Sequence, residues 1–177
     1  MKGVISLSIE DRLSRAVRIF LLIFLLSYII FTVYAILIPK EGTKFTEFYL
    51  LGENGKAENY PSNFSINRPE TVIIGIHNHE YRNIRYTIEI YAAETTFDTI
   101  TNISQFKRMV FLERSHVMLT PDSRSLVSHK IAIPATGYNR LIFLLFKDET
   151  PPDTLFGIDR ANNSYLKLDL AISSKND

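Results

Sequence analysis

The stretch from residue 84 to residue 92 reads IRYTIEIYA, and its apolar and polar side chains alternate. Successive side chains of an extended strand point to opposite sides. One face would therefore carry Ile84, Tyr86, Ile88, Ile90 and Ala92, and the other Arg85, Thr87, Glu89 and Tyr91. Such alternation is typical of a strand with one face in a hydrophobic core, and it predicts a β-rich domain around these residues.

The same kind of pattern recurs on both sides of this stretch. Further strands are predicted at 45–51, 71–78, 107–119, 126–133, 138–146 and 164–172, while residues 94–106 fit either a loop or a short helical turn. Residues 71–76 and 141–146 are apolar on both faces, which places one of them centrally in each of two sheets. Turn residues separate the runs, and residues 79–83 look like a short hairpin connection. About seven short strands predict a mainly β chain with a two-sheet antiparallel sandwich over residues 45–173 and a tail at 174–177.

A second kind of segment precedes this domain. Residues 19–38 read IFLLIFLLSYIIFTVYAILI and carry no charge. As a helix they would be about 30 Å long, which matches the hydrocarbon core of a bilayer. We interpret residues 9–38 as one helix whose apolar part, 19–38, spans the membrane. A signal peptide cleaved after Val33-Tyr34-Ala35 is an alternative, although the apolar run is longer than is usual for one. A buried helix of a soluble protein is a further alternative.

The flanks of the apolar run predict its orientation. Four basic residues precede it and two follow it: Lys2, Arg12, Arg15 and Arg18, then Lys40 and Lys44. The side with more basic residues is usually cytoplasmic. We therefore expect residues 1–18 to be cytoplasmic, residues 39–44 to be a linker, and the β domain to lie outside the cell. The expected product is a single-pass protein of the cell membrane.

Composition excludes several classes of protein. The 177 residues carry a net charge of +1, which is too small for a nucleic-acid binder that works by bulk electrostatics. The chain contains no Cys, so disulfide scaffolds, thiolate zinc sites, iron–sulfur clusters and Cys nucleophiles are excluded. Motifs of serine hydrolases, phosphate-binding loops and zinc proteases are absent as well. The expected protein is not an enzyme, and no catalytic residue, cofactor or bound metal is predicted.

Two sets of residues are candidate metal ligands. His77 and His79 lie two apart on one predicted strand and hence on one face, with His116 or His129 as a distant third ligand. The preferred interpretation of this pair is a solvated or hydrogen-bonded strand end. Asp148, Asp153 and Asp159 resemble a calcium loop in composition, but their spacing matches no calcium motif.

The segment 148–163, DETPPDTLFGIDRANN, is a long connection before the last strand. Loops of this length are often functional. One interpretation is a packed loop that uses Phe156 as its plug. A second is a partner-binding tip formed by Leu155, Phe156 and Asp159, and a third is a disordered loop. Three Asn-x-Ser sequences, at Asn63, Asn102 and Asn162, fall in predicted loops and are candidate glycosylation acceptors on an outside domain.

The strings FTEFYLLG at 45–52, GKAENYP at 55–61 and NHE at 78–80, followed by Asn83 and Tyr86-Thr87, support a resemblance. Over residues 44–172 the chain resembles an archaeal membrane-protein family catalogued as domain of unknown function 1616. The resemblance implies an immunoglobulin-like extracellular domain and supplies no catalytic residues. Many members have several membrane spans before this domain, so functions that reside in those spans are not carried over.

Two classes of function follow from these observations. The first is an outward-facing interaction module, a scaffold or accessory subunit whose partners are the lipid bilayer and other membrane or cell-surface proteins. The second is binding of a glycan or envelope polymer, with exposed tyrosines such as Tyr91 or Tyr165 as the stacking groups.

Overall fold

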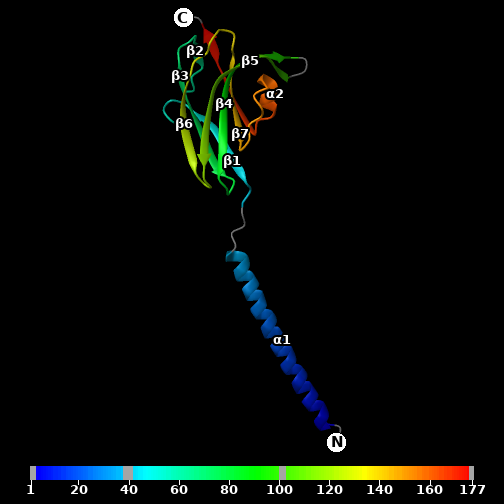
Figure 1. Cartoon of the computed structure of the whole chain (residues 1–177). Coiled ribbons are helices and arrows are strands. Elements are labelled where there is room, and N and C mark those ends of the chain that lie inside the picture. Colours follow the sequence, from blue (N-terminus) through cyan, green and yellow to red (C-terminus); the bar gives the residue numbers. More distant parts are fainter. Residues whose placement is uncertain (1–2, 38–41, 100–102, 176–177) are drawn as a thin grey trace. The chain divides into compact units, whose positions relative to one another are not determined.

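The computed structural model describes residues 3–37, 42–99 and 103–175. The chain divides into two compact units, Met1–Gly42 and Thr43–Asp177, which are a helix and a β domain (Figure 1). The predicted linker at 39–44 lies partly outside the described residues. Strand β1 begins at Phe45, where the first strand was predicted.

The first unit contains helix α1, Gly3–Leu37, which begins six residues before the predicted start at Ile9. Among the described residues this is the one helix long and apolar enough to cross a membrane, and the most apolar 18-residue window within Arg12–Leu37 has a mean hydropathy of 2.7. The two small polar side chains of the apolar run, Ser27 and Thr32, bond within the helix. Ser27 donates to the carbonyl of Phe24 at 2.9 Å, and Thr32 donates to the carbonyl of Tyr28 at 2.8 Å. The hydroxyl groups of Ser27 and Thr32 therefore need no water.

The second unit is an immunoglobulin-like β-sandwich, which confirms the predicted fold class. Over the described residues its elements are β1 (Phe45–Leu51), β2 (Asn63–Ser65), β3 (Glu70–His79), β4 (Ile84–Asp98), β5 (Ile103–Leu119), β6 (Arg124–Ile131), β7 (Arg140–Lys147), α2 (Gly157–Asn162), β8 (Leu166–Ala171) and β9 (Ser173–Lys175). One sheet has the order β1-β3-β6 and the other β5-β4-β7-β8. Their paired strands are antiparallel, and the short strands β2 and β9 form a separate parallel pair.

The two strands that are apolar on both faces, β3 and β7, were predicted to be central in their sheets, and the structure confirms this. β3 lies between β1 and β6, and β7 lies between β4 and β8. The main core fills the space between the two sheets with the inward residues of each, among them Val72, Ile74 and Ile76 on β3 and Ile84, Tyr86, Ile88 and Ile90 on β4. The alternation of residues 84–92 therefore marks the core face as predicted.

The prediction of a hairpin connection at residues 79–83 is wrong, because this connection crosses from the sheet that contains β3 to the sheet that contains β4. Asn78, which is fully buried, supports the crossing. Its side-chain amide donates to the carbonyls of Arg82, Leu119 and Thr120 at 2.8–3.1 Å. A buried amide with several acceptors stabilises a connection that no strand ladder supports.

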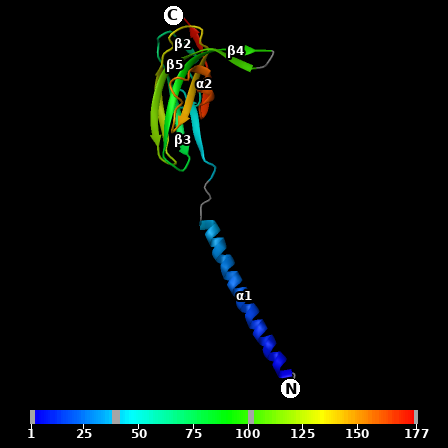
Figure 2. The same cartoon turned by 45° about the vertical axis from the view of Figure 1, so that its right-hand side comes forward.

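Other boundaries also differ from the prediction. Of the ambiguous stretch 94–106, residues 94–98 belong to β4 and residues 103–106 to β5, and the far ends of these strands project beyond the rest of the sandwich (Figure 2). The register between these strands shifts at Ile90/Tyr91 and at Glu94/Thr95. Residues 174–175, expected in a tail, belong to β9, because Ser173 bonds to the carbonyl of Ser62 at 2.6 Å and holds the strand in place.

Candidate functional site

The outer face of the sheet β5-β4-β7-β8 is covered by the segment 148–163, which includes α2 (Figures 1 and 2). A second apolar cluster lies beneath this segment, formed by Tyr91, Ala93, Ile142, Leu144, Phe146 and Ala161. The sheet is therefore buried on both of its faces over β4 and β7. This explains why β7 is apolar at nearly every position.

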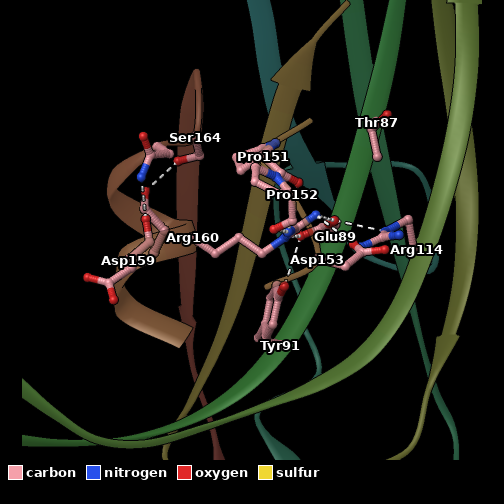
Figure 3. A network of polar contacts seen from close by, with 12 residues as sticks. Thr87, Glu89, Tyr91, Arg114, Pro151, Pro152, Asp153, Asp159, Arg160 and Ser164 are labelled. Carbon is pink, nitrogen blue, oxygen red and sulfur yellow. Dashed lines mark hydrogen bonds and ion pairs between the residues drawn. The ribbon is translucent and has the colours of Figure 1, made fainter. Parts of the chain in front are cut away.

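A fully buried carboxylate lies at the centre of this covered face. Glu89 of β4 accepts two hydrogen bonds from Arg160 of α2, from Nε at 2.5 Å and from Nη2 at 2.6 Å (Figure 3). Arg114 of β5 donates to the same carboxylate at 2.8 Å, and so does the hydroxyl of Tyr91. A buried carboxylate is stable when charged donors satisfy it in this way.

The same two arginines bind the covering segment. Nη1 of Arg160 donates to the carbonyls of Pro151 and Pro152 at 3.0 Å each, and Nη2 of Arg114 donates to Asp153 at 2.7 Å. The negative charges of Glu89 and Asp153 are therefore neutralised by the positive charges of Arg114 and Arg160. Together they fasten residues 151–160 onto the sheet.

The pKa values follow from this geometry. Burial alone would raise the pKa of Glu89, but the hydrogen bonds from Arg160 and Tyr91 and the charges of both arginines outweigh it, so the pKa lies below its ordinary value. Burial and the bond to Glu89 raise the pKa of Tyr91. The hydrogen bond to Glu89 raises the pKa of Arg160 despite burial. Glu89 is therefore ionised and Arg160 protonated at neutral pH. We call the network of Glu89, Arg114, Asp153 and Arg160 the clamp.

An apolar groove opens beside this clamp. It has a volume of about 290 Å³, its walls are Met109 and Phe111 of β5 and Leu155 and Phe156 of the covering segment, and polar groups of the clamp lie at its base. Phe156 is 77% exposed. A neighbouring hollow of about 200 Å³ shares Met109 and Phe156 and extends the surface to Ile158. The exposed apolar side chains of the groove thus lie next to the residues of the ion-pair network.

The structure brings two of the three predicted loop residues together. Leu155 and Phe156 both line the groove, whereas Asp159 lies exposed on α2 and is not among the groove residues. The interpretation of Phe156 as the plug is wrong. Phe156 is exposed, and the buried residues of α2 are Arg160, which pairs with the buried carboxylate of Glu89, and Ala161, which belongs to the apolar cluster. Sequence reasoning missed Arg160, since a six-residue helix shows no usable periodicity.

Two of the three acids that resemble a calcium loop in composition pair with arginines. Asp148 pairs with Arg82, and that bond lowers its pKa. Asp153 pairs with Arg114, which lowers its pKa likewise. Within the described residues, the three aspartates form no metal-ligand cluster.

The two candidate histidines do lie together, but with partners that the sequence did not indicate. The ring centroids of His77 and His79 are 3.8 Å apart. His116 instead bonds to Thr87 at 2.9 Å, and His129 bonds to Glu113 at 2.9 Å. The groups that join the pair are Glu47 and Asp122.

The remaining candidates were the glycosylation acceptors and the stacking tyrosines. Asn63 lies in β2 and Asn162 ends α2, so neither is in a loop, although both are exposed; Asn102 lies outside the described residues. Tyr91 was expected to be exposed and is buried beneath α2. Tyr165 is partly exposed, but Lys147 lies 4.0 Å from its ring centre and its hydroxyl donates to Glu80. Neither ring is a free stacking platform.

Comparison with known proteins gives a family. The model of a domain of unknown function, DUF1616, matches residues 39–173. No match was found among curated proteins. Similar solved structures include the CARDB domain of a Pyrococcus furiosus protein, determined in complex with di-metal ions, at 11% identity and a TM-score of 0.41, covering 78% of this chain and 98% of that one.

Two further structures show the same range of similarity. One is PapD-like domain 7 of human CEP192, at 10% identity and a TM-score of 0.41, covering 79% of this chain and 94% of that one. The other is a β-glucosidase of Erythrobacter marinus, at 12% identity and a TM-score of 0.43, covering 75% of this chain and 16% of that one. The likeness in each case is one of fold alone.

Proposed function

The chain belongs to the DUF1616 family, and we propose that it is a non-catalytic, membrane-tethered binding module whose β-sandwich docks another membrane or cell-surface protein. In this proposal α1 is a single-pass anchor with its N-terminus in the cytoplasm, and the sandwich faces outward. The chain then serves as a scaffold or accessory subunit of a surface complex. The observation that carries the proposal is the apolar groove between β5 and the covering segment.

Several apolar side chains around the groove are exposed, so they contribute more to the docking of a partner than to the packing of the core. Phe111, Phe156 and Ile158 are exposed on one side of the domain, and all three lie on or beside the groove. Exposed apolar side chains that gather over one region are typical of sites for protein partners. Aromatic anchors held in a preformed hollow are also the commonest contributors to binding energy.

The clamp beneath the groove supplies its rigidity. Arg160 and Arg114 bond the covering segment to β4 and β5, so Leu155 and Phe156 lose little freedom when a partner binds. Preorganisation of this kind increases affinity, because less conformational entropy is lost on association. The occupant that fits is a large apolar side chain, or a short hydrophobic segment, of the partner protein.

The test is a quantitative pull-down of the tagged, full-length chain from its native membranes in mild detergent. We expect Phe156→Asp to lower recovery of the specific partner by roughly 25-fold, which corresponds to a hot-spot contribution of about 2 kcal/mol. The matched control is Leu126→Asp on β6 of the other sheet, where Leu126 is 52% exposed and the same charge should change nothing. Equal recovery with both variants would contradict docking through the groove.

A further inference from the structure

A second cluster of chemically active side chains lies on the outer face of the sheet β1-β3-β6. His77 and His79 occupy the last positions of β3, and Glu47 of β1 is the register partner of His77. Asp122 reaches the same place from the turn between β5 and β6. The cluster belongs to the opposite sheet from the groove, so the inference drawn from it does not depend on the proposed function.

The imidazoles lie between the two carboxylates. Toward Glu47, Nδ1 of His77 and Nε2 of His79 lie 3.5 and 3.4 Å from its two oxygens. Toward Asp122, the opposite nitrogens, Nε2 of His77 and Nδ1 of His79, lie 3.4 and 3.5 Å from a single oxygen. Each histidine thus presents one ring nitrogen to each acid.

These separations do not correspond to hydrogen bonds. An N–H to oxygen bond spans about 2.7–3.2 Å, and Nε2 of His79 is buried with no hydrogen-bond partner. The separations do match a metal site, because bonds of about 2.0–2.2 Å place the ligand atoms of tetrahedral Zn²⁺ about 3.3–3.6 Å apart. Glu47, His77 and His79 each offer a ligand atom within 4.8 Å of those of the other two.

We propose that Glu47, His77 and His79 bind a divalent transition-metal ion, best fitted by Zn²⁺. Two imidazole nitrogens and one carboxylate are donors that suit Zn²⁺, and the partial exposure of the site leaves a fourth position for water. Asp122 completes the site as the outer acceptor. With the ion on the side of Glu47, the two remaining imidazole N–H groups face Asp122 and are oriented by it, as is usual for metal-bound histidine.

The surrounding structure holds the ligands in place. The ring of Phe45 stacks on His79, with centroids 4.5 Å apart. The turn that carries Asp122 is bound to β3 between the two histidines, since the backbone of Asn78 exchanges hydrogen bonds with Asp122 and Ser123 at 2.7 and 3.0 Å. A bound ion joins the start of β1 to the end of β3, and thereby stabilises the domain when metal is present.

The experiment is calorimetric titration of ZnCl₂ into the metal-stripped, full-length chain in detergent, purified with a tag that contains no histidine. We expect one Zn²⁺ per chain with micromolar or tighter affinity. His77→Ala and His79→Ala should each weaken binding at least about 100-fold, and Asp122→Asn by about 10–100-fold, as is usual for an outer-shell partner. Zn²⁺ should raise the Tm of the native chain and of neither histidine variant.

The chain contains its own matched controls. His116 and His129 are its two other histidines, so His116→Ala and His129→Ala should leave Zn²⁺ affinity unchanged. Glu47→Gln tests the site without disturbing folding, because Glu47 is an exposed side chain; it should also weaken binding. Absence of Zn²⁺ binding by the native chain, or binding that survives replacement of His77 and His79, would overturn the proposal.

Discussion

Replacing Glu89 by Gln is expected to lower the free energy of unfolding of the β domain by about 3–5 kcal/mol, because it leaves the buried Arg160 without its counter-charge. Urea unfolding of residues 43–177, which form a compact unit with their own core, measures the change. The matched control is Glu94→Gln on the same strand. Glu94 pairs with Arg108 at the surface, at 3.4 Å, so its loss should cost less than about 1 kcal/mol.

The same network predicts how stability depends on pH. The pKa of Glu89 is lower in the folded chain than its ordinary value of 4.5. Its contribution to stability is therefore complete above the unfolded pKa and is lost as the pH falls through the folded pKa. The native domain should lose stability steeply on acidification below about pH 4.5, and Glu89→Gln should show a shallower dependence. Equal stability of the Glu89→Gln and Glu94→Gln variants at pH 7 would contradict the role assigned to the clamp.

Labelling of single cysteines should show the two ends of the chain on opposite sides of the membrane. The native chain contains no Cys, so each introduced thiol is the only one present. Asn54→Cys lies in an exposed turn of the β domain and should react with a membrane-impermeant maleimide in intact cells. Ser8→Cys, in the segment predicted to be cytoplasmic, should react only after the cells are permeabilised. The expected contrast is nearly all-or-none.

A matched extraction completes the membrane test. The full chain should stay in the membrane pellet at alkaline pH, whereas a chain that begins at Thr43 should move to the supernatant, because α1 supplies the apolar length that spans a bilayer. Labelling of Ser8→Cys in intact cells would reverse the proposed orientation. Release of the full chain at alkaline pH would contradict the anchor.

The fold could be predicted from the sequence where the pattern of apolar residues in a strand shows which of its faces are buried. The alternation of residues 84–92 marks the core face correctly, and the apolar strands β3 and β7 are central as predicted. The connection 79–83 was misjudged, because local turn chemistry does not reveal whether the next strand joins the same sheet or the opposite one. The short strands β2 and β9 were missed because three residues carry no measurable period.

The functional residues were harder to predict, because their contacts join distant segments. Alternation indicates that Glu89 faces away from the core, but it does not reveal that α2 covers that face and brings Arg160 to it. The register of β1 against β3 places Glu47 opposite His77, and this register is not visible in either strand alone. Leu155 and Phe156 were identified because two large apolar residues in a polar loop need an explanation, and both line the groove.

The groove beside Phe156 is the proposed binding site for a partner protein. The most direct test of this proposal replaces Phe156 by a photo-crosslinking phenylalanine analogue in the full chain, followed by irradiation of native membranes. We expect one discrete adduct that contains a second membrane or cell-surface protein, and no such adduct when the analogue replaces Leu126. Absence of an adduct at Phe156, or the same adduct from both positions, would contradict the proposal.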